Sequence, residues 1–265
     1  EDGLQILEQL DYKDSLGNLY SAITERLGFH RTEGEFKVMG MAANGDSKFF
    51  NLHPLVKADG DLFKVDPKIY SETGSKSCYE SFYNRQYFDS LNLPSRRFNE
   101  SIKTDHFNLA ASLQDVFEFW LIKIVSKYSS EYNSLVYSGG CALNCLANMK
   151  IKGFFDNFYI MPAASDRGLS LGAACICSSE KSECVKKLDT MLLGRDYSDS
   201  SIADEFEKLG INYTEVDPFD TAAQLLSDGM IIGWHQGRSE FGPRALGARS
   251  VLALATSPGV KDRIN

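Results

Sequence analysis

Residues 134–144 read Ser-Leu-Val-Tyr-Ser-Gly-Gly-Cys-Ala-Leu-Asn, and this stretch decides the fold class. Residues 134–137 form a short apolar run that is typical of a strand, and Gly139 and Gly140 then break it. Helical periodicity resumes over residues 142–150. A strand that passes through a glycine turn into a helix is the beginning of an α/β layer.

The segments on both sides continue this alternation. A long amphipathic helix precedes the stretch, with an apolar stripe over residues 107–125 and Thr104 as its expected N-cap. A strand over 157–161, a loop over 162–168 and a small-residue helix over 169–178 follow it. Together these segments predict a mixed α/β domain.

The first hundred residues add helices and a hairpin. Apolar spacing predicts a helix over 15–27, which Gly28 ends. Two short strands are expected within 48–66, around the turn at 58–61. Residues 71–97 are polar and aromatic without a period, which indicates an irregular insertion.

The composition changes over residues 181–200, which are polar and interrupted by Gly194. This change predicts a domain boundary there, with one domain over 1–193 and a second over 194–265. The second domain is expected to contain a helix over 202–209, a strand over 211–216, a helix over 220–226 and a strand over 230–234.

Composition and charge exclude several classes of protein. The 265 residues are 43% apolar and 24% charged, close to globular averages, which argues against disorder and fibrous repeats. A net charge of −8 without a long basic run argues against nucleic acid as a partner. Because the sequence has neither a long apolar segment nor a signal peptide, we expect a cytoplasmic protein without a membrane partner. The histidines lack metal-binding spacing, so no complete metal site is visible.

Three loops could carry chemistry, and the first is the glycine turn at 138–144. Backbone N–H groups beside two glycines can approach an anion closely, and the dipole of the following helix is positive there, so the turn suits a phosphate. The alternative is a tight strand-to-helix turn that needs glycine only for its positive φ, and this segment alone favours that alternative.

The second loop, at 162–168, contains Asp166. A carboxylate between a strand and a Gly-Ala-rich helix can bind Mg²⁺ or a transition metal next to a nucleotide. The alternative is that Asp166 or Ser165 caps the following helix. Because both loops follow neighbouring strands, we expect Gly139, Gly140 and Asp166 to face one cleft.

The third loop, at 233–250, concentrates Arg238, Arg244 and Arg249 in an otherwise acidic chain. Guanidinium groups suit phosphate and carbonyl oxygens, and the four glycines and one proline of this stretch shape a defined loop. Glu240 could orient an arginine or merely neutralise it. A structural network of arginine and glutamate at the surface is the alternative.

Taken together, the loops resemble the O-carbamoyltransferase family, which includes nodulation carbamoyltransferases and enzymes that carbamoylate cephamycin and aminoglycoside antibiotics. The resemblance rests on residues 37–45, 138–144, 166–168 with 172–174, and 237–250, in this order and spacing. Within the first motif, Met41 and Asn44 replace the family's usual leucine and aromatic residue. This difference affects packing near the nucleotide cleft more than it affects the reacting groups.

The resemblance implies an architecture. Residues 1–193 would be the second half of an actin/Hsp70-like (ASKHA) ATPase domain, and residues 194–265 the start of a YrdC-like α/β domain. The family's H-x-x-x-H metal pair is absent from this sequence. The chain therefore reads as a piece of a longer polypeptide, and we expect the isolated piece to be inactive.

The resemblance also implies a reaction in two steps. Carbamoyl phosphate and ATP would give carbamoyl adenylate in the YrdC-like domain, and the carbamoyl group would then pass to a hydroxyl of a small-molecule acceptor at the domain that holds a divalent metal, Fe or Mg. The implied residues are Arg238, Arg244 and Arg249 for the anionic donor, Gly139, Gly140, Asn144 and Gly168 for the nucleotide, and Asp166 for the metal.

Two other functions fit part of the sequence. An ATP-binding actin/Hsp70-like module that acts as a regulator or assembly partner would account for the glycine loops. A sugar or acetate kinase of the same superfold would also use them. Neither function explains the arginine cluster after Gly233.

Overall fold

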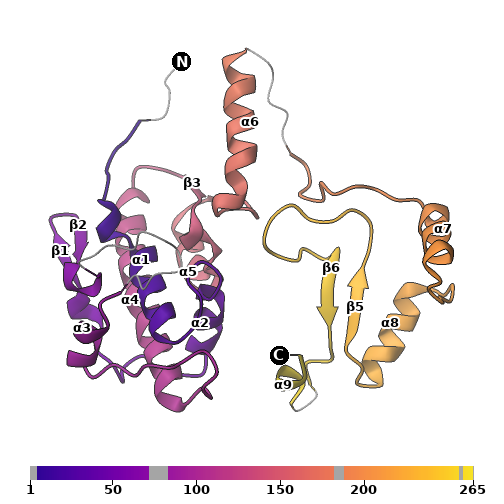
Figure 1. The fold of residues 1–265 in the computed structure, drawn as a ribbon. Helices are drawn as coiled ribbons and strands as arrows, with labels where there is room; N and C mark the ends of the chain where they lie inside the picture. The colour runs from indigo at the N-terminus through magenta and orange to yellow at the C-terminus, as the bar shows by residue number, and fades with distance from the viewer. Residues whose placement is uncertain (1–4, 72–82, 182–187, 257–258, 265) are drawn as a thin grey trace. The chain divides into compact units, whose positions relative to one another are not determined.

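The computed structural model describes residues 5–71, 83–181, 188–256 and 259–264. The chain divides into two compact units, Glu1–Ile160 and Met161–Asn265 (Figure 1). Within the described residues the strands form three two-stranded sheets, and helices make up most of the remaining regular structure. The mixed α/β class predicted from the sequence is confirmed.

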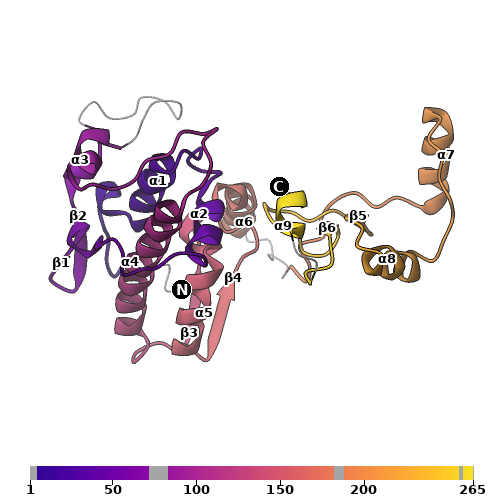
Figure 2. The ribbon, with the colours of Figure 1, turned by 90° about the horizontal axis from the view of Figure 1, so that it is seen from below.

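The first unit combines helices with a hairpin and a parallel pair of strands (Figure 2). Its elements are α1 (Leu16–Arg26), α2 (Glu35–Ala42), β1 (Val56–Asp59), β2 (Leu62–Val65), α3 (Arg85–Ser90), α4 (Thr104–Tyr128), β3 (Ser134–Tyr137), α5 (Cys145–Ile151) and β4 (Asn157–Ile160).

Helix α4 is the centre of this unit and contacts α1, α2 and α5. The predicted apolar stripe is confirmed, because Leu109, Leu113, Val116 and Phe117 are all buried in one hydrophobic cluster. Burying each such side chain stabilises a fold by roughly 1.5–3 kcal/mol relative to exposure. Trp120 continues the stripe and contacts Phe63 of β2, with ring centroids 5.2 Å apart.

The N-terminus of α4 differs from the prediction. Thr104 is the first helical residue and not the cap. Instead, the imidazole Nδ1 of His106 accepts the backbone N–H of Lys103 at 3.0 Å, so a side chain in the first turn reaches back to the residue that precedes the helix. His106 is buried, and loss of hydration lowers its pKa below 6.5.

The other elements of the first unit follow the sequence closely. Ser15 caps α1 by accepting the N–H of Asn18 at 3.3 Å, and the chain turns at Gly28 with φ of +74°. Strands β1 and β2 pair antiparallel around Gly60, as predicted. The irregular insertion predicted for 71–97 is partly wrong, because α3 forms there; its residues 72–82 lie outside the described residues.

The second unit contains four helices and one hairpin within its described residues. These elements are α6 (Leu169–Glu180), α7 (Asp199–Leu209), α8 (Pro218–Ser227), β5 (Ile232–His235), β6 (Arg249–Leu252) and α9 (Val260–Ile264). The predicted strand over 211–216 is wrong. These residues are exposed and pair with no strand in the described part of the chain, and an extended segment without a ladder partner gains none of the hydrogen bonds that make a strand.

Strand β6 is an element that the sequence did not predict. It pairs antiparallel with β5, from Ile232 opposite Leu252 to His235 opposite Arg249. The arginine-rich loop therefore joins two paired strands, and its two ends are held at a fixed separation (Figure 1). No helix in the described residues is long and apolar enough to cross a membrane.

Candidate functional site

The glycine turn follows β3, which runs parallel to β4 with Tyr137 opposite Ile160 (Figure 2). Gly139 has φ of +87°, a conformation that residues with a side chain disfavour. The local backbone conformation therefore explains why this residue is glycine. Gly140 does not have a positive φ, and a Cβ added there would meet none of the described atoms within 4 Å. Its exposed backbone is therefore open to a ligand, as the phosphate hypothesis requires.

The helix after the turn starts later than predicted. A single 3₁₀ turn, Gly140–Leu143, comes first, and α5 begins only at Cys145. Asn144 caps α5, since its Oδ1 accepts the N–H of Ala147 at 3.1 Å. A polar cap directly before the first helical residue is the usual signal for a helix start, and it is more specific here than the apolar spacing.

The side chain of Asn144 also forms a reciprocal amide pair with Gln114 of α4. Gln114 Nε2 donates to Asn144 Oδ1 at 3.0 Å, and Asn144 Nδ2 donates to Gln114 Oε1 at 2.9 Å. Both residues are buried. The glycine turn is thereby anchored to the central helix. The nucleotide role expected for Asn144 stays a prediction.

Gln114 is the residue that the sequence analysis missed. Besides the amide pair, it accepts the hydroxyl of Tyr20 at 2.9 Å and donates to Glu118 at 2.8 Å. Glu118 in turn pairs with Lys150 of α5. Burial raises the pKa of Tyr20 above its usual value. The available signal was a polar pair four residues apart inside the apolar stripe of α4.

The loop at 162–168 leaves Asp166 exposed at the start of a 3₁₀ turn, Asp166–Gly168. Neither Ser165 nor Asp166 makes a side-chain capping bond to this turn or to α6, so the capping alternative is wrong. Gly168 has a packing reason for being glycine, because an added Cβ would lie 2.4 Å from the carbonyl oxygen of Ala163. Asp166 and Gly139 belong to different units, and their facing one cleft stays a prediction.

Asp166 alone does not fit a metal centre. Among the described residues, no group of three or more His, Cys, Asp or Glu side chains could hold a metal ion. One carboxylate leaves most coordination positions of a divalent ion without a protein ligand. We therefore assign no reaction step to a metal in this chain.

The arginine-rich loop is organised around Glu240, whose side chain is shielded from solvent. One carboxylate oxygen, Oε1, accepts three backbone N–H groups, from Leu246 and Ala248 at 2.8 Å and from Arg249 at 3.1 Å. The loop thus closes around a single carboxylate, in the manner of a backbone anion nest.

Arg249 binds Glu240 through two of its nitrogens. Nε donates to Glu240 Oε2 at 2.8 Å, and Nη2 donates to the Glu240 carbonyl oxygen at 3.0 Å. The Arg249 guanidinium and the backbone N–H groups hold the pKa of Glu240 well below its usual range. Glu240 therefore orients Arg249, and the same ion pair offsets part of its charge.

Arg238 and Gly194 lie against each other in the second unit. Arg238 Nε donates to the Gly194 carbonyl at 2.6 Å, and the Gly194 N–H donates to the Ser239 carbonyl at 2.9 Å. A Cβ at Gly194 would lie 2.7 Å from the Ser239 nitrogen. The residue chosen as a domain boundary is therefore part of the support of the arginine loop. Arg244 is half-buried in the same loop.

A shallow depression lies where the loop meets the hairpin. Its lining includes Trp234, His235, Ala245, Arg249 and Ser250. The strand register places His235 directly opposite Arg249. His235 was not among the predicted site residues, since its position beside an arginine depends on strand β6.

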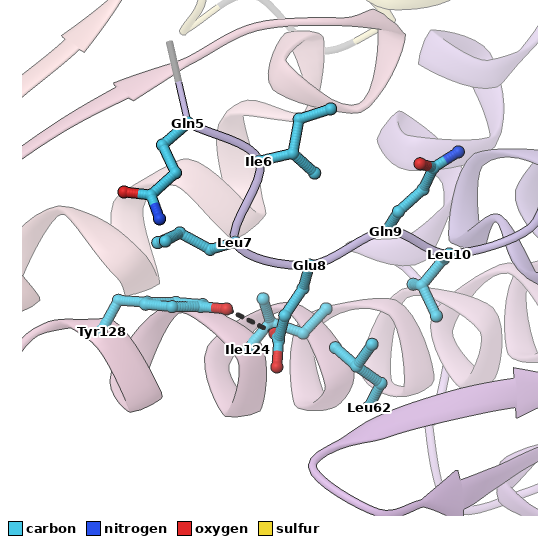
Figure 3. A pocket seen from close by; sticks show the side chains of 9 residues that line it. All are labelled: Gln5, Ile6, Leu7, Glu8, Gln9, Leu10, Leu62, Ile124 and Tyr128. Carbon is cyan, nitrogen blue, oxygen red and sulfur yellow. Dashed lines mark hydrogen bonds between the residues drawn. The ribbon is translucent and has the colours of Figure 1, made fainter. Parts of the chain in front are cut away.

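A second depression, in the first unit, has a different character (Figure 3). The segment 5–10 borders it with Leu62, Ile124 and Tyr128, and most of the lining is aliphatic. The Glu8 carboxylate accepts the Tyr128 hydroxyl and pairs with Lys127. Because its carboxylate is already paired, this depression offers less chemistry than the arginine loop does.

Comparison with known proteins gives the family. Residues 1–175 match the family model described as carbamoyltransferase N-terminus, and residues 223–265 match the one described as carbamoyltransferase C-terminus. The chain belongs to the carbamoyltransferase family. The glycine turn and Asp166 lie within the first match, and the arginine loop lies within the second.

Named relatives agree with the family models. The chain is 34% identical to nodulation protein NolNO of Sinorhizobium fredii, over 95% of this chain and 37% of the relative. It is 29% identical to the 3'-hydroxymethylcephem-O-carbamoyltransferase of Streptomyces clavuligerus, over 86% of this chain and 40% of the relative. An uncharacterised protein of Synechocystis is 33% identical, over 92% of this chain and 42% of the relative. The chain spans about two fifths of the length of these relatives.

Proposed function

We propose that this chain is part of an ATP-dependent O-carbamoyltransferase, which moves a carbamoyl group from carbamoyl phosphate to a hydroxyl of a small-molecule acceptor, a natural product or a sugar. The observation that carries the proposal is the arginine loop, closed on Glu240 and lying within the match to the carbamoyltransferase C-terminus. The name of the Streptomyces relative supports a hydroxyl as the acceptor.

The reaction would run through carbamoyl adenylate. Water first cleaves carbamoyl phosphate to carbamate, and inorganic phosphate leaves. In the two transfer steps, a carbamate oxygen bonds to the α-phosphorus of ATP and pyrophosphate leaves; the acceptor hydroxyl then loses its proton and attacks the carbamoyl carbon, and AMP leaves. Both steps build negative charge on transferring oxygens, which guanidinium groups stabilise. Arg238, Arg244 and Arg249 are the groups proposed for the donor.

The glycine turn is the proposed nucleotide site. Open backbone at Gly140, next to the turn at Gly139, suits a phosphate, and the anchor through Asn144 keeps the turn in place. Gly168 would belong to the same site. Asp166 is proposed as one ligand of a divalent metal, Fe or Mg, whose other ligands would come from outside the described residues.

The proposed architecture follows the family resemblance. Residues 1–193 would belong to an actin/Hsp70-like (ASKHA) domain, and residues 194–265 to a YrdC-like domain. The cytoplasm is the proposed location, since carbamoyl phosphate and ATP are both available there.

An ATP-binding regulatory module without transferase activity is the second candidate. The open glycine turn favours it as much as it favours a transferase, but the arginine loop does not. The two functions differ in what they require, because only the transferase needs carbamoyl phosphate.

A direct assay of the full-length protein tests the proposal. ATP and carbamoyl phosphate are supplied with a hydroxylated acceptor such as a cephem alcohol or an aminoglycoside, and AMP and the carbamate ester are measured. Formation of AMP only when carbamoyl phosphate is present supports the transferase. Hydrolysis of ATP to ADP regardless of carbamoyl phosphate would support the regulatory module instead.

A further inference from the structure

Arg249 has one side of its guanidinium group committed and the other available. Nε and Nη2 bind Glu240, whereas Nη1 has no hydrogen-bond partner among the described residues. The side chain is 49% exposed and lines the depression beside His235. A half-exposed arginine with a fixed plane and a free donor is prepared for an oxygen ligand.

The fixed plane of Arg249 depends on Glu240 being immobile itself. Oε1 of Glu240 is held by three backbone N–H groups and cannot follow a moving arginine. These N–H groups also stabilise the negative charge of the carboxylate. Glu240 therefore orients Arg249 without cancelling all of the positive potential around its guanidinium group. An unsupported surface arginine would instead sample many rotamers and lose more entropy when it bound a ligand.

We propose that Glu240 is a positioning residue for the carbamoyl donor: it holds Arg249 so that Nη1 meets an oxygen of the donor's phosphoryl group. This inference rests on the proposed function. It assigns the phosphate group of the donor, a mixed acyl phosphate, to Nη1 of Arg249. Glu240 itself does not touch the donor. A second reading, in which Glu240 only closes the loop, makes different predictions.

Glu240→Gln separates these two roles. The glutamine oxygen can still accept the three backbone N–H groups, so the loop keeps its closure. The glutamine Nε2, however, is a donor and faces the Nε donor of Arg249, so the arginine keeps only its bond to the backbone carbonyl of residue 240 and is no longer held in one plane. If Glu240 only closes the loop, Glu240→Gln should leave the kinetic constants unchanged. If Glu240 positions Arg249, Glu240→Gln should weaken the binding of the carbamoyl donor alone.

The measurement uses the full-length protein. In Glu240→Gln we expect the KM for carbamoyl phosphate to rise at least about tenfold, as for loss of a charge-assisted hydrogen bond, with an unchanged KM for ATP. Inorganic phosphate, titrated calorimetrically, should bind more weakly by a similar factor. Glu205→Gln is the matched control, since Glu205 pairs with Lys208 at 3.4 Å on the exposed surface of the same unit, and it should change neither value.

A double mutant adds a readout that a structural role would not produce. If Glu240 acts through Arg249, then Glu240→Gln combined with Arg249→Ala should be no worse than Arg249→Ala alone. Defects that multiply would overturn the proposal, as would an unchanged KM in Glu240→Gln. If Glu240→Gln does not fold, Arg249→Lys decides: it keeps the charge but has no Nη1, so wild-type phosphate binding in that variant would overturn the proposal.

These outcomes are separate from the failure of the proposed function. A wild-type protein that binds phosphate more tightly than Glu240→Gln, but does not use carbamoyl phosphate, would contradict the carbamoyl transfer and keep the positioning role. If Glu240→Gln transfers the carbamoyl group as well as the wild-type protein does, the proposed function stands and the positioning role of Glu240 is contradicted.

Discussion

The amide pair between Gln114 and Asn144 shows how a buried side-chain contact holds the glycine turn. Removing Gln114 would leave the buried Nδ2 group of Asn144 and the Tyr20 hydroxyl without the acceptor that they share in the structure. An unsatisfied buried polar group costs about 1–3 kcal/mol. We expect Gln114→Ala to lower the free energy of unfolding by about 2–4 kcal/mol on the same grounds, measured by urea denaturation.

The control for this prediction is Gln86→Ala, because Gln86 is exposed on α3 in the same unit. It should change the free energy of unfolding by less than about 0.5 kcal/mol. The double mutant of Gln114 and Asn144 to alanine should cost less than the sum of the single mutants, since each removes the same pair. Strict additivity would show that the pair does not hold the turn.

Arg244 gives a second prediction at the scale of one residue. In the full-length protein, Arg244→Ala should slow the use of carbamoyl phosphate by roughly 10–150-fold, the equivalent of about 1.5–3 kcal/mol for a lost charged hydrogen bond. ATP binding at the glycine turn should be largely unchanged. Carbamoyl transfer at the wild-type rate would remove Arg244 from the donor site.

The sequence predicted which single residues belong to the candidate site, but it did not predict which residues they contact. The motif singled out Asn144 and Glu240, but their partners lie elsewhere. Gln114 is 30 residues from Asn144 in the chain, and the N–H groups around Glu240 become neighbours only when the loop closes. Contacts of this type depend on tertiary structure, which local spacing does not encode.

At the scale of elements, α4 offers a test of its unusual N-terminus. His106 must be neutral at Nδ1 to accept the Lys103 N–H, and burial lowers its pKa below 6.5. Protonation is therefore easier in the unfolded chain than in the folded one. The stability that His106 provides should be complete above about pH 6.5 and should decrease as the pH falls below that value.

Two variants of His106 separate the cap from the titration. His106→Ala should cost about 1 kcal/mol at pH 8, the usual value of a lost cap. His106→Gln keeps an acceptor in the first turn and should flatten the pH dependence of urea unfolding between pH 8 and 5.5. His30→Gln, at an exposed histidine, is the control. If the free energy of unfolding depends on pH with the same slope in His106→Gln and in wild type, His106 is not the source of that dependence.

Elements with strong periodicity or clear caps were predictable, and elements that depend on a distant partner were not. Helix α1 and the β1–β2 hairpin follow from local signals, namely Ser15, Gly28 and the turn at Gly60. The segment 211–216 has strand-like apolar spacing but pairs with no strand among the described residues, whereas β6 has weaker spacing and pairs with β5. Pairing, rather than composition, decides which extended segment becomes a strand.

At the scale of the whole molecule, the chain corresponds to about two fifths of its relatives. We expect the isolated 265 residues to show no carbamoyl transfer, because Asp166 provides only one carboxylate for the proposed metal. Incubation of the purified chain with ATP, carbamoyl phosphate and Fe²⁺ or Mg²⁺, followed by AMP analysis, checks this. Robust turnover by the isolated chain would show that these residues already contain a complete site.

The family followed from four motifs in a fixed order, and the mixed α/β class followed from the alternation of strands and helices around residues 134–144, because both signals are local in the sequence. The arrangement of domains does not follow from them. The structure divides at residue 160, whereas the composition changes near Gly194, and Gly194 itself packs on the arginine loop. The domain boundary proposed near Gly194 stays a prediction.

The measurement that tests carbamoyl transfer most directly is isotope exchange between pyrophosphate and ATP in the full-length protein. If ATP is cleaved at its α-phosphorus by a carbamoyl donor, labelled pyrophosphate should enter ATP only when carbamoyl phosphate is present, and Arg244→Ala should suppress that exchange. Release of ADP without any exchange, at the same rate with or without carbamoyl phosphate, would contradict the account and identify an ATPase or kinase instead.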